Sequence, residues 1–411
     1  MTSSTAAIDQ VREHVGRTLA GFIGRKRAAL AGVDEDLLPV LDAISNLLAG
    51  GKRLRPAFCY WGWRAAGGAG PTHSAGLTDR TDPADRTDPA DRTGPADRTG
   101  PADRAGRAGG ADSQILTAAA ALELLHASAL VHDDVIDGSE TRRGQPAMHR
   151  RFAAQHAAGR WRGSADSFGA GAAILIGDLL MAWTGELLRA SGLPTAALRR
   201  GQPVLDAMRT EMIAGQYLDL LGQAAGNGTV ESALRVIRYK SAKYTVEHPL
   251  LLGAALAAGV AGTATAETGA AGRTQRQVAA ACTGYGIPLG VAFQLRDDVL
   301  GVFGDAAETG KPVTGDLREG KRTVLVTIAR NRASAEQARV LRRHLGDPQL
   351  DEAAAARVRS VLTETGALAE CEQMIRSSVR EALAALADAP FTGEAKIALA
   401  ELAATATDRA D

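Results

Sequence analysis

The sequence predicts an all-α protein. Alanine and leucine dominate the chain, apolar residues recur at spacings of three and four, and runs of alternating β-branched residues are scarce. A strand–turn–helix unit with a glycine-rich phosphate fingerprint is missing from the sequence, so a nucleotide-binding α/β fold has little support.

Apolar periodicity divides most of the chain into helices separated by polar or glycine-rich breaks. A break rich in Gly, Ala and Ser over 155–170 predicts a loop. The expected helices, with shorter pieces up to residue 407, cover 35–48, 54–66, 114–137, 171–191, 197–221, 229–240, 245–260 and 274–303.

Composition limits the classes of protein and partner. The chain has 411 residues, of which 45% are hydrophobic, enough for a substantial core. Lys and Arg together number 47, as do Asp and Glu, so there is no chain-wide basic field for nucleic acid. The three cysteines form no Cys-x-x-Cys pair, which argues against disulfides and structural zinc and favours a cytoplasmic location.

We expect neither a signal peptide nor a transmembrane segment. The N-terminus lacks a basic segment followed by an apolar core. The apolar stretch 249–262 is about one buried helix long and falls short of the roughly 20 residues that span a bilayer.

Residues 81–104 form a tandem six-residue repeat, TDPADR-TDPADR-TGPADR-TGPADR, which contains no large apolar side chain. Such a segment cannot bury enough surface to offset the entropy cost of ordering. We therefore expect 67–112 to be a disordered, low-complexity insertion within a single domain that covers 1–411.

The strongest chemical signal is an acidic cluster at the end of an apolar helix, in LELLHASALVHDDVIDGSETRRG. Asp133, Asp134 and Asp137 lie within about one turn, where like charges repel. Their oxygen atoms, without a His/Cys set, favour Mg²⁺ over zinc. Arg142 and Arg143 follow closely, and guanidinium groups suit bidentate phosphate binding. The combination favours a metal–diphosphate site over a solvated acidic helix end.

A second acidic cluster repeats this design in FQLRDDVLGVFGD. Gln294 lies three and four residues before Asp297 and Asp298 at the end of another apolar helix, so all three share one face. Lys311 and Lys321 follow in a Gly-rich stretch that can approach an anion closely. Two charged residues between these lysines, Asp316 and Arg318, are consistent with an ordinary charged loop after a helix.

Three shorter motifs add anion-binding groups, and each is weak by itself. GGKRLRP opens a helix with Lys52 and Arg55 three apart on one face, beside exposed backbone N–H groups. YKSAKYT supplies Lys240 and Ser241, and GQYLDL places two polar side chains three apart. His126 lies two turns before the first aspartate motif, where a lone histidine is usually a satisfied core residue.

In this order, GGKRLRP, HDDVIDGSETRRG, GQYLDL, KSAKYT and FQLRDD resemble the motifs of the polyprenyl synthetase family, the trans-isoprenyl diphosphate synthases, over residues 35–330. GGKRLRPAFCYWGWRAAG and RDDVLGVFGD look like actinobacterial geranylgeranyl-type synthases. The resemblance implies a single-domain antiparallel helical bundle around a central cavity and a homodimer. It also implies that the two aspartate motifs face each other across the cavity mouth.

The resemblance assigns roles to individual residues. It implies about three Mg²⁺ ions per active site, held by Asp133, Asp137, Asp297 and Asp298. It implies that the allylic diphosphate is bound by Arg142, Lys240, Ser241, Gln294, Lys311 and Lys321. It implies that isopentenyl diphosphate is bound by Lys52, Arg55, His126 and Arg143.

The reaction implied by the resemblance is head-to-tail condensation. Metal ions and basic groups stabilise negative charge on the departing diphosphate, and a water-excluding cavity holds the allylic cation that isopentenyl diphosphate attacks. The expected catalytic residues are Asp133, Asp134, Asp137, Lys240, Asp297 and Asp298.

Product length is expected to depend on side chains about one turn before the first motif. Ser128 and Ala129 are small, and Leu125 lies deeper. In the family, aromatic residues at the first two positions shorten products to fifteen carbons. We therefore expect geranylgeranyl diphosphate, with twenty carbons, while farnesyl and longer products stay open.

One position departs from the family pattern. Gly301 stands where the second motif usually has its third aspartate, and Asp305, one turn later, is a candidate substitute. This departure is the one feature in favour of a non-catalytic subunit of a heteromeric synthase. A class I terpene cyclase has less support, because the second cluster is Asp-Asp and aromatic residues make up only 4% of the chain.

Overall fold

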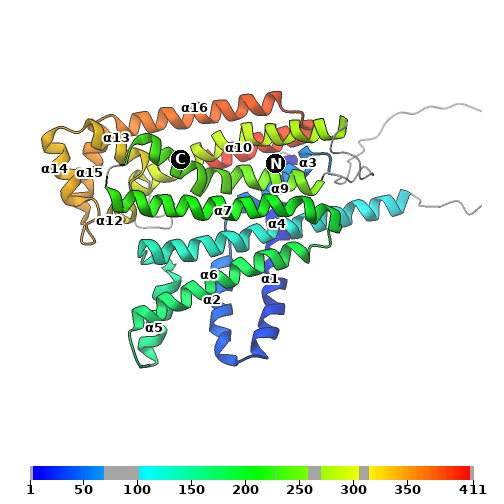
Figure 1. Cartoon of the computed structure of the whole chain (residues 1–411), viewed down its shortest axis with the longest axis horizontal. Coiled ribbons are helices and arrows are strands. Elements are labelled where there is room, and N and C mark those ends of the chain that lie inside the picture. Colours follow the sequence, from blue (N-terminus) through cyan, green and yellow to red (C-terminus); the bar gives the residue numbers. More distant parts are fainter. Residues whose placement is uncertain (1–2, 69–100, 227, 258–269, 305–313, 408–411) are drawn as a thin grey trace, which may run out of the picture.

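The computed structural model describes residues 3–68, 101–226, 228–257, 270–304 and 314–407. These ranges are almost entirely helical, with one two-stranded hairpin, which confirms the all-α prediction (Figure 1). The first half contains α1 (Ser3–Ala31), η1 (Glu35–Leu37), α2 (Leu38–Leu48), α3 (Leu54–Ala65), α4 (Pro101–Asp137), β1 (Thr141–Arg142), β2 (Gln145–Pro146), α5 (Met148–Ala158) and α6 (Ala165–Arg189). The second half contains α7 (Thr195–Ala225), α8 (Val230–Val236), η2 (Ile237–Glu247), α9 (His248–Ala257), α10 (Ala270–Phe303), α12 (Gly315–Glu319), α13 (Val324–Arg332), α14 (Ala335–His344), α15 (Glu352–Glu364), α16 (Ala367–Asp388) and α17 (Gly393–Thr407).

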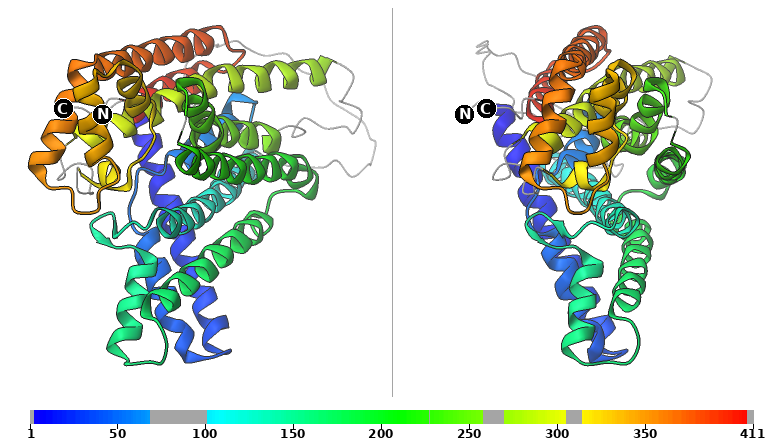
Figure 2. Two further views of the ribbon diagram at one scale, coloured as in Figure 1. Left: turned by 60° about the vertical axis from the view of Figure 1, so that its left-hand side comes forward. Right: turned by 90° about the vertical axis from the view of Figure 1, so that its left-hand side faces the viewer.

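Long helices pack side by side to form the body of the bundle. Helix α4 packs on α6, α3 on α9, and α10 on both η2 and α16. The guanidinium of Arg296 on α10 pairs with both carboxylate oxygens of Glu372 on α16, at 2.6 and 3.0 Å, and fixes these two helices together. The hairpins α1–α2 and α5–α6 extend from the body in a common direction (Figure 2).

Three helices are long and apolar enough to cross a membrane by length and composition alone, and all three exceed the apolar stretch 249–262. In their most apolar windows, 67%, 44% and 56% of the residues are buried inside the protein. Packing of α4 on α6 and of α10 on α16 therefore accounts for much of this apolar character. These helices are Gly110–Asp137, Ala165–Arg189 and Thr274–Phe303.

The structure differs from the sequence expectations at several places. Helices α1 and α5 were not expected, although in α1 Val11, Val15 and Leu19 form a buried stripe at four-residue spacing. The loop over 155–170 is confined to 159–164, between α5 and α6. Helix α4 begins at Pro101, so the last part of the expected disordered insertion, 101–112, is helical; residues 69–100 lie outside the described ranges.

Two glycines allow helices α3 and α9 to cross at close range. A Cβ atom added at Gly62 would lie 2.8 Å from Cα of Leu250, and one added at Gly253 would lie 2.7 Å from the backbone nitrogen of Trp63. Neither position has room for a methyl group, because the neighbouring atoms belong to backbone.

We expect Gly253→Ala to lower the free energy of unfolding by about 1–3 kcal/mol, since overpacking forces the two helices apart. Thermal unfolding followed by circular dichroism measures this loss. Gly16→Ala is the matched control: an added Cβ there meets no described atom within 4 Å. It should be neutral or stabilising, because alanine favours helix. Equal melting temperatures for Gly253→Ala and the unaltered chain would contradict the close crossing.

Candidate active site at the ends of two buried helices

The first acidic cluster lies where α4 ends. Gly138 adopts φ 66° and stops the helix, and the β1–β2 hairpin then returns Arg142 to the aspartates. Nε of Arg142 donates to both carboxylate oxygens of Asp134, at 2.9 and 3.2 Å, and its guanidinium lies 3.7 Å from Asp133. Asp134 is therefore held by Arg142, which leaves Asp133 and Asp137 to face other groups.

Lys240 reaches Asp133 from the π-helix η2. Its Nζ lies 3.1 Å from Asp133 Oδ1 and 2.7 Å from Asp219 Oδ2 on α7. Two glycines make this possible: an added Cβ at Gly215 of α7 would lie 2.7 Å from Cα of Lys240, and one at Gly290 of α10 would lie 2.5 Å from Cα of Ala242. Helix η2 is thus held closely between α7 and α10.

Lys321 joins the first cluster to the segment that follows α10. Its Nζ lies 3.4 Å from Asp137 Oδ2, 3.4 Å from Asp316 Oδ1 and 2.9 Å from Glu319 Oε2. Ser139, just after α4, donates a 3.0 Å hydrogen bond to Glu319. The end of α4 and helix α12 are therefore in direct contact.

The ionisation of these carboxylates follows from their surroundings. Burial opposes the charge on Asp133, but Lys240, Lys321 and Arg142 outweigh it and lower its pKa. Burial, and then the charge on Asp133, raises the pKa of Asp137 to about 6. The two aspartates thus differ in their readiness to carry a negative charge.

The second cluster lies near the end of α10. Nε2 of Gln294 donates a 2.9 Å hydrogen bond to Asp298 Oδ1. Burial raises the pKa of Asp298 to about 8 against this hydrogen bond, and the charges of Asp316 and Asp297 act in the same direction as burial. These surroundings favour the protonated form of Asp298 unless a cation is bound beside it.

Both carboxylate oxygens of Asp137 are buried and accept no hydrogen bond from the described residues, which fits a role as metal ligand. Within the described ranges, no group of three or more His, Cys, Asp or Glu side chains lies close enough together to hold a metal ion by itself. An ion held by few carboxylates completes its shell with water or phosphate oxygens, as Mg²⁺ commonly does. The residues present therefore fit Mg²⁺ better than a metal with an all-protein shell.

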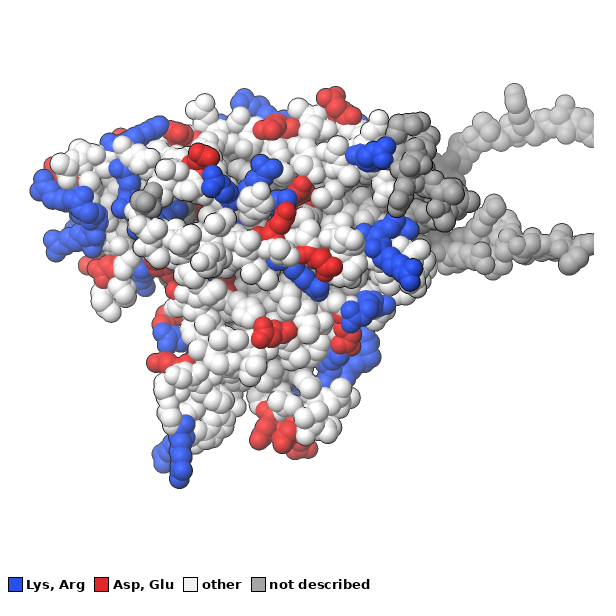
Figure 3. All heavy atoms as spheres, in the orientation of Figure 1, with Lys and Arg blue, Asp and Glu red and all other residues white. Residues whose placement is uncertain are grey.

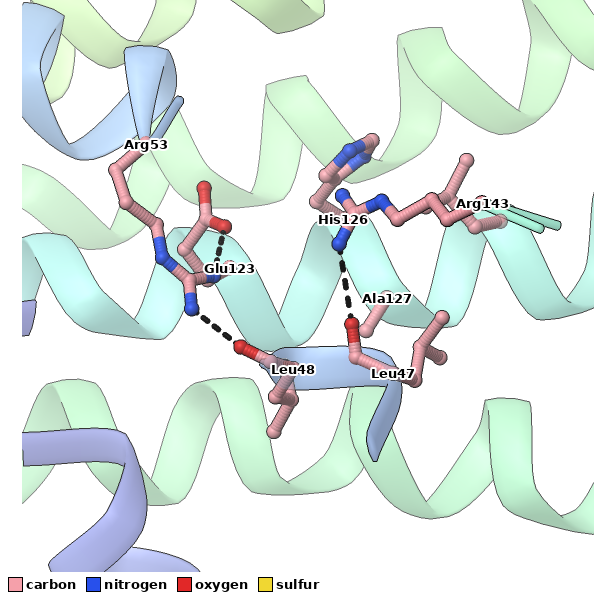
Figure 4. Close-up of a pocket in the computed structure, with 8 residues that line it drawn as sticks. Leu47, Leu48, Arg53, Glu123, His126, Ala127 and Arg143 are labelled. Atoms are coloured by element: carbon pink, nitrogen blue, oxygen red, sulfur yellow. Dashed lines mark hydrogen bonds and ion pairs between the residues drawn. The ribbon is translucent and has the colours of Figure 1, made fainter. Parts of the chain in front are cut away.

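A narrow basic pocket lies beside the first cluster, between α2, α4 and the loop after β1 (Figure 4). Arg53 donates a 2.5 Å hydrogen bond to the buried Glu123 and another to the carbonyl of Leu48. Arg143 donates to the carbonyl of Leu47 at 3.2 Å. Arg53 and Arg143 both have left-handed backbones, with φ of 51° and 53°, and such strain is typical of functional sites.

Two further contacts extend this pocket toward η2. Arg55 donates a 2.9 Å hydrogen bond to Thr245, and its guanidinium lies 4.3 Å from the ring centre of Tyr244. The hydroxyl of Tyr244 lies 2.9 Å from Nδ1 of His126. Burial, followed by the charges of Arg55 and Arg143, lowers the pKa of His126 far below its usual value. Because Glu123 is the one acidic side chain lining the pocket, the cluster is suited to bind an anion.

The structure places most of the residues singled out from the sequence in these two groups. Lys52 lies exposed on the loop before α3, and Ser241 is half-buried beside Lys240. Lys311 and Asp305 lie outside the described residues.

Of the proposed chain-length residues, Ser128 and Ala129 lie about one turn before Asp133, and Leu125 lies about two turns before it. Leu125 is fully buried, and Ser128 donates a 2.7 Å hydrogen bond to the carbonyl of Gly177 on α6. Ser128 therefore points at α6, whereas Ala129 is only partly buried.

Sequence reasoning missed several residues that the structure brings to the site. Glu123 has a signal, since it precedes His126 by one helical turn. Tyr244 follows Lys240 by four residues, but no pattern announces the π-helix that aligns them. Asp316 had been assigned to an ordinary charged loop, yet it contacts Lys321, as does Glu319, which was not singled out from the sequence.

Comparison with known proteins gives the family. The polyprenyl synthetase family model matches residues 102–362. A geranylfarnesyl diphosphate synthase of Aeropyrum pernix is 30% identical over 68% of this chain and 78% of that protein. A geranylgeranyl diphosphate synthase of Mycobacterium tuberculosis is 30% identical over 68% of this chain and 71% of that protein, and an octaprenyl diphosphate synthase of Escherichia coli is 29% identical over 70% and 78%.

Solved structures agree with the sequence comparison. A geranylgeranyl pyrophosphate synthase of Corynebacterium glutamicum, crystallised with isoprenyl diphosphate and magnesium, superposes with a TM-score of 0.81 and 35% identity, over 98% of this chain and 99% of that one. The expected isoprenoid synthase fold is confirmed. The chain belongs to the polyprenyl synthetase family and is a trans-prenyltransferase that elongates isoprenoid diphosphates.

Proposed function

We propose that the chain joins isopentenyl diphosphate head to tail, by a 1′-4 bond, to allylic diphosphates, and that geranylgeranyl diphosphate is its main product. The observation that carries this proposal is the bridge formed by Lys321, whose Nζ lies 3.4 Å from Asp137 and 3.4 Å from Asp316. One ammonium group thereby links the end of α4 to the segment that follows α10. An allylic diphosphate bound between the two acidic clusters would be held from both sides.

The residues at this mouth divide into two kinds. Asp133, Asp137, Asp297 and Asp298 would hold Mg²⁺, about three ions in all, with Asp134 orienting Arg142. When bound, Mg²⁺ would neutralise negative charge on the leaving diphosphate. The side chains that would bind the phosphate oxygens are those of Arg142, Lys240, Gln294, Lys311 and Lys321, with Ser241 beside them. Asp298 orients the amide of Gln294 by accepting its 2.9 Å hydrogen bond.

The basic pocket of Figure 4 would take isopentenyl diphosphate. Arg55 and Arg143 surround His126, and the excess of positive charge suits a diphosphate, with Lys52 at the rim. Tyr244 lies between this pocket and Lys240, so it connects the two substrate sites. The attack of the double bond on the allylic cation would take place along this face of η2.

A buried apolar path would take the growing chain away from the mouth. Leu122, Leu125 and Val131 of α4 are almost completely buried, so the side of this helix that faces the protein interior excludes water. The small Ala129 leaves more room than an aromatic residue would, which supports a product longer than fifteen carbons. Relatives of this chain include geranylgeranyl, geranylfarnesyl and octaprenyl diphosphate synthases, so farnesyl and longer products are the alternatives that the assay distinguishes.

We further propose that the chain acts as a single domain and a cytoplasmic homodimer. Helix α7 exposes Ile213, Tyr217, Leu220 and Leu221 at helical spacing, and a second copy would cover such a stripe. Acidic and basic side chains both occur on the face drawn in Figure 3, with Lys and Arg gathered at its left-hand end.

Purified chain incubated with Mg²⁺, isopentenyl diphosphate and each allylic primer should release diphosphate and form a twenty-carbon product. Chelation with EDTA should stop the reaction. Asp133→Ala should lower turnover by about 10²-fold or more, because it removes charge stabilisation at the leaving group.

Asp388→Ala is the control for that variant, because Asp388 is exposed at the end of α16. Full turnover with EDTA, or in Asp133→Ala, would defeat the assignment. A chain that binds substrates but forms no product alone would point to the non-catalytic subunit.

Ala129→Phe should shorten the product, because the aromatic ring fills space one turn before Asp133. Product length by chromatography of the dephosphorylated alcohols checks this. Ser128→Phe serves as a comparison: its ring would strike α6, since Ser128 bonds to Gly177, so it should mainly lower the melting temperature. An unchanged product length from a folded, active Ala129→Phe variant would refute the proposal that the growing isoprenoid chain runs past Ala129.

A further inference from the structure

Position 301 is the one place where the second acidic motif lacks its usual carboxylate. Gly301 follows Asp298 by three residues and Asp297 by four, so it lies on the same face of α10. A Cβ atom added at Gly301 would lie 2.9 Å from Cγ of Asp316, and one of the carboxylate oxygens would be closer still. The carboxylate of Asp316 therefore occupies the volume that a side chain at 301 would take.

The fold fixes Asp316 in this place. It lies on α12, whose Leu317 is buried and accepts a 2.9 Å hydrogen bond from the backbone N–H of Gly346. The guanidinium of Arg318 donates to the carbonyl of Leu350, at 3.1 and 2.9 Å. Backbone and side-chain bonds thus anchor α12 directly after Asp316, which is not a solvated loop residue.

Asp316 also faces the first acidic cluster. Lys321 bridges Asp316 to Asp137, and the backbone N–H of Lys321 donates to the carbonyl of Asp316 at 3.1 Å. Asp137 has a side chain that is 2% exposed, and its oxygens accept no hydrogen bond within the described ranges. Lys321 is thus a cation that Asp137 and Asp316 share in this space.

We propose that Asp316 supplies the third carboxylate of the second acidic cluster, in place of the side chain that Gly301 lacks, and helps Asp297 and Asp298 to hold the metal-bound diphosphate. This inference rests on the proposed function. It removes the one feature that favoured a non-catalytic subunit, because the carboxylate absent from α10 is provided by α12.

The test moves the carboxylate from one position to the other. In Asp316→Ala the remaining Cβ would lie 3.6 Å from a Cβ at 301, which is an ordinary contact. The double variant Gly301→Asp/Asp316→Ala therefore has room for the new side chain, whereas Gly301→Asp alone collides with Asp316. Two quantities are measured for each variant: the Mg²⁺ concentration at half-maximal turnover, and Mg²⁺-dependent binding of inorganic diphosphate by calorimetry.

Asp316→Ala and the isosteric Asp316→Asn should raise the Mg²⁺ concentration at half-maximal turnover by about tenfold or more, as expected when a group that supports a metal site is lost. They should weaken Mg²⁺-dependent binding of diphosphate by a similar factor. The double variant should regain most of this loss, and Gly301→Asp alone should not improve on the unaltered chain. Asp388→Ala again serves as the control and should leave both quantities unchanged.

Unaltered Mg²⁺ dependence and diphosphate binding in a folded Asp316→Asn variant would overturn the inference. So would a folded double variant that is no better than Asp316→Ala. If the unaltered chain bound diphosphate with Mg²⁺ through Asp316 but formed no prenyl product, the proposed reaction would fail while this assignment stood.

Discussion

The structure depends on the neutralisation of acidic side chains buried at the ends of two apolar helices. Carboxylates in such a place cost several kcal/mol each unless cations lie beside them. Lys240 supplies one of those cations from η2, and Lys321 supplies another from the segment just after α12. Both segments are far from α4 in the sequence. Because each lysine contacts carboxylates from more than one element, the same ion pairs that make burial tolerable also set the geometry of the mouth.

The sequence predicted the helices that line the site and the residues at their ends. Apolar periodicity placed α4 and α10 correctly up to the acidic clusters, because a buried helix that ends in charge has a clear pattern. It missed α1, whose apolar stripe is narrow and surrounded by charged residues. Helix α4 extends into the insertion, where alanine favours helix although large apolar residues are missing.

Contacts between distant segments account for the rest of what the sequence could not predict. The pairing of Arg53 with Glu123 depends on a left-handed residue before α3, and the alignment of Lys240 with Tyr244 depends on a π-helix. The position of Asp316 over Gly301 depends on the anchoring of α12. In each case local sequence does not show which residues will meet, because the partner arrives through tertiary packing. The reason for a glycine at position 301 becomes clear only from the structure, where Asp316 of α12 occupies the space of a side chain at that position.

The central claim is that both acidic clusters act on one diphosphate, and metal positions test it most directly. Crystals grown with Mn²⁺ and inorganic diphosphate would show the metal by its anomalous signal. The account predicts metal bound by Asp133 and Asp137 on one side and by the carboxylates of Asp297, Asp298 and Asp316 on the other, with the diphosphate between them and in contact with Lys240 and Lys321. Metal confined to one cluster, or diphosphate bound elsewhere, would contradict it.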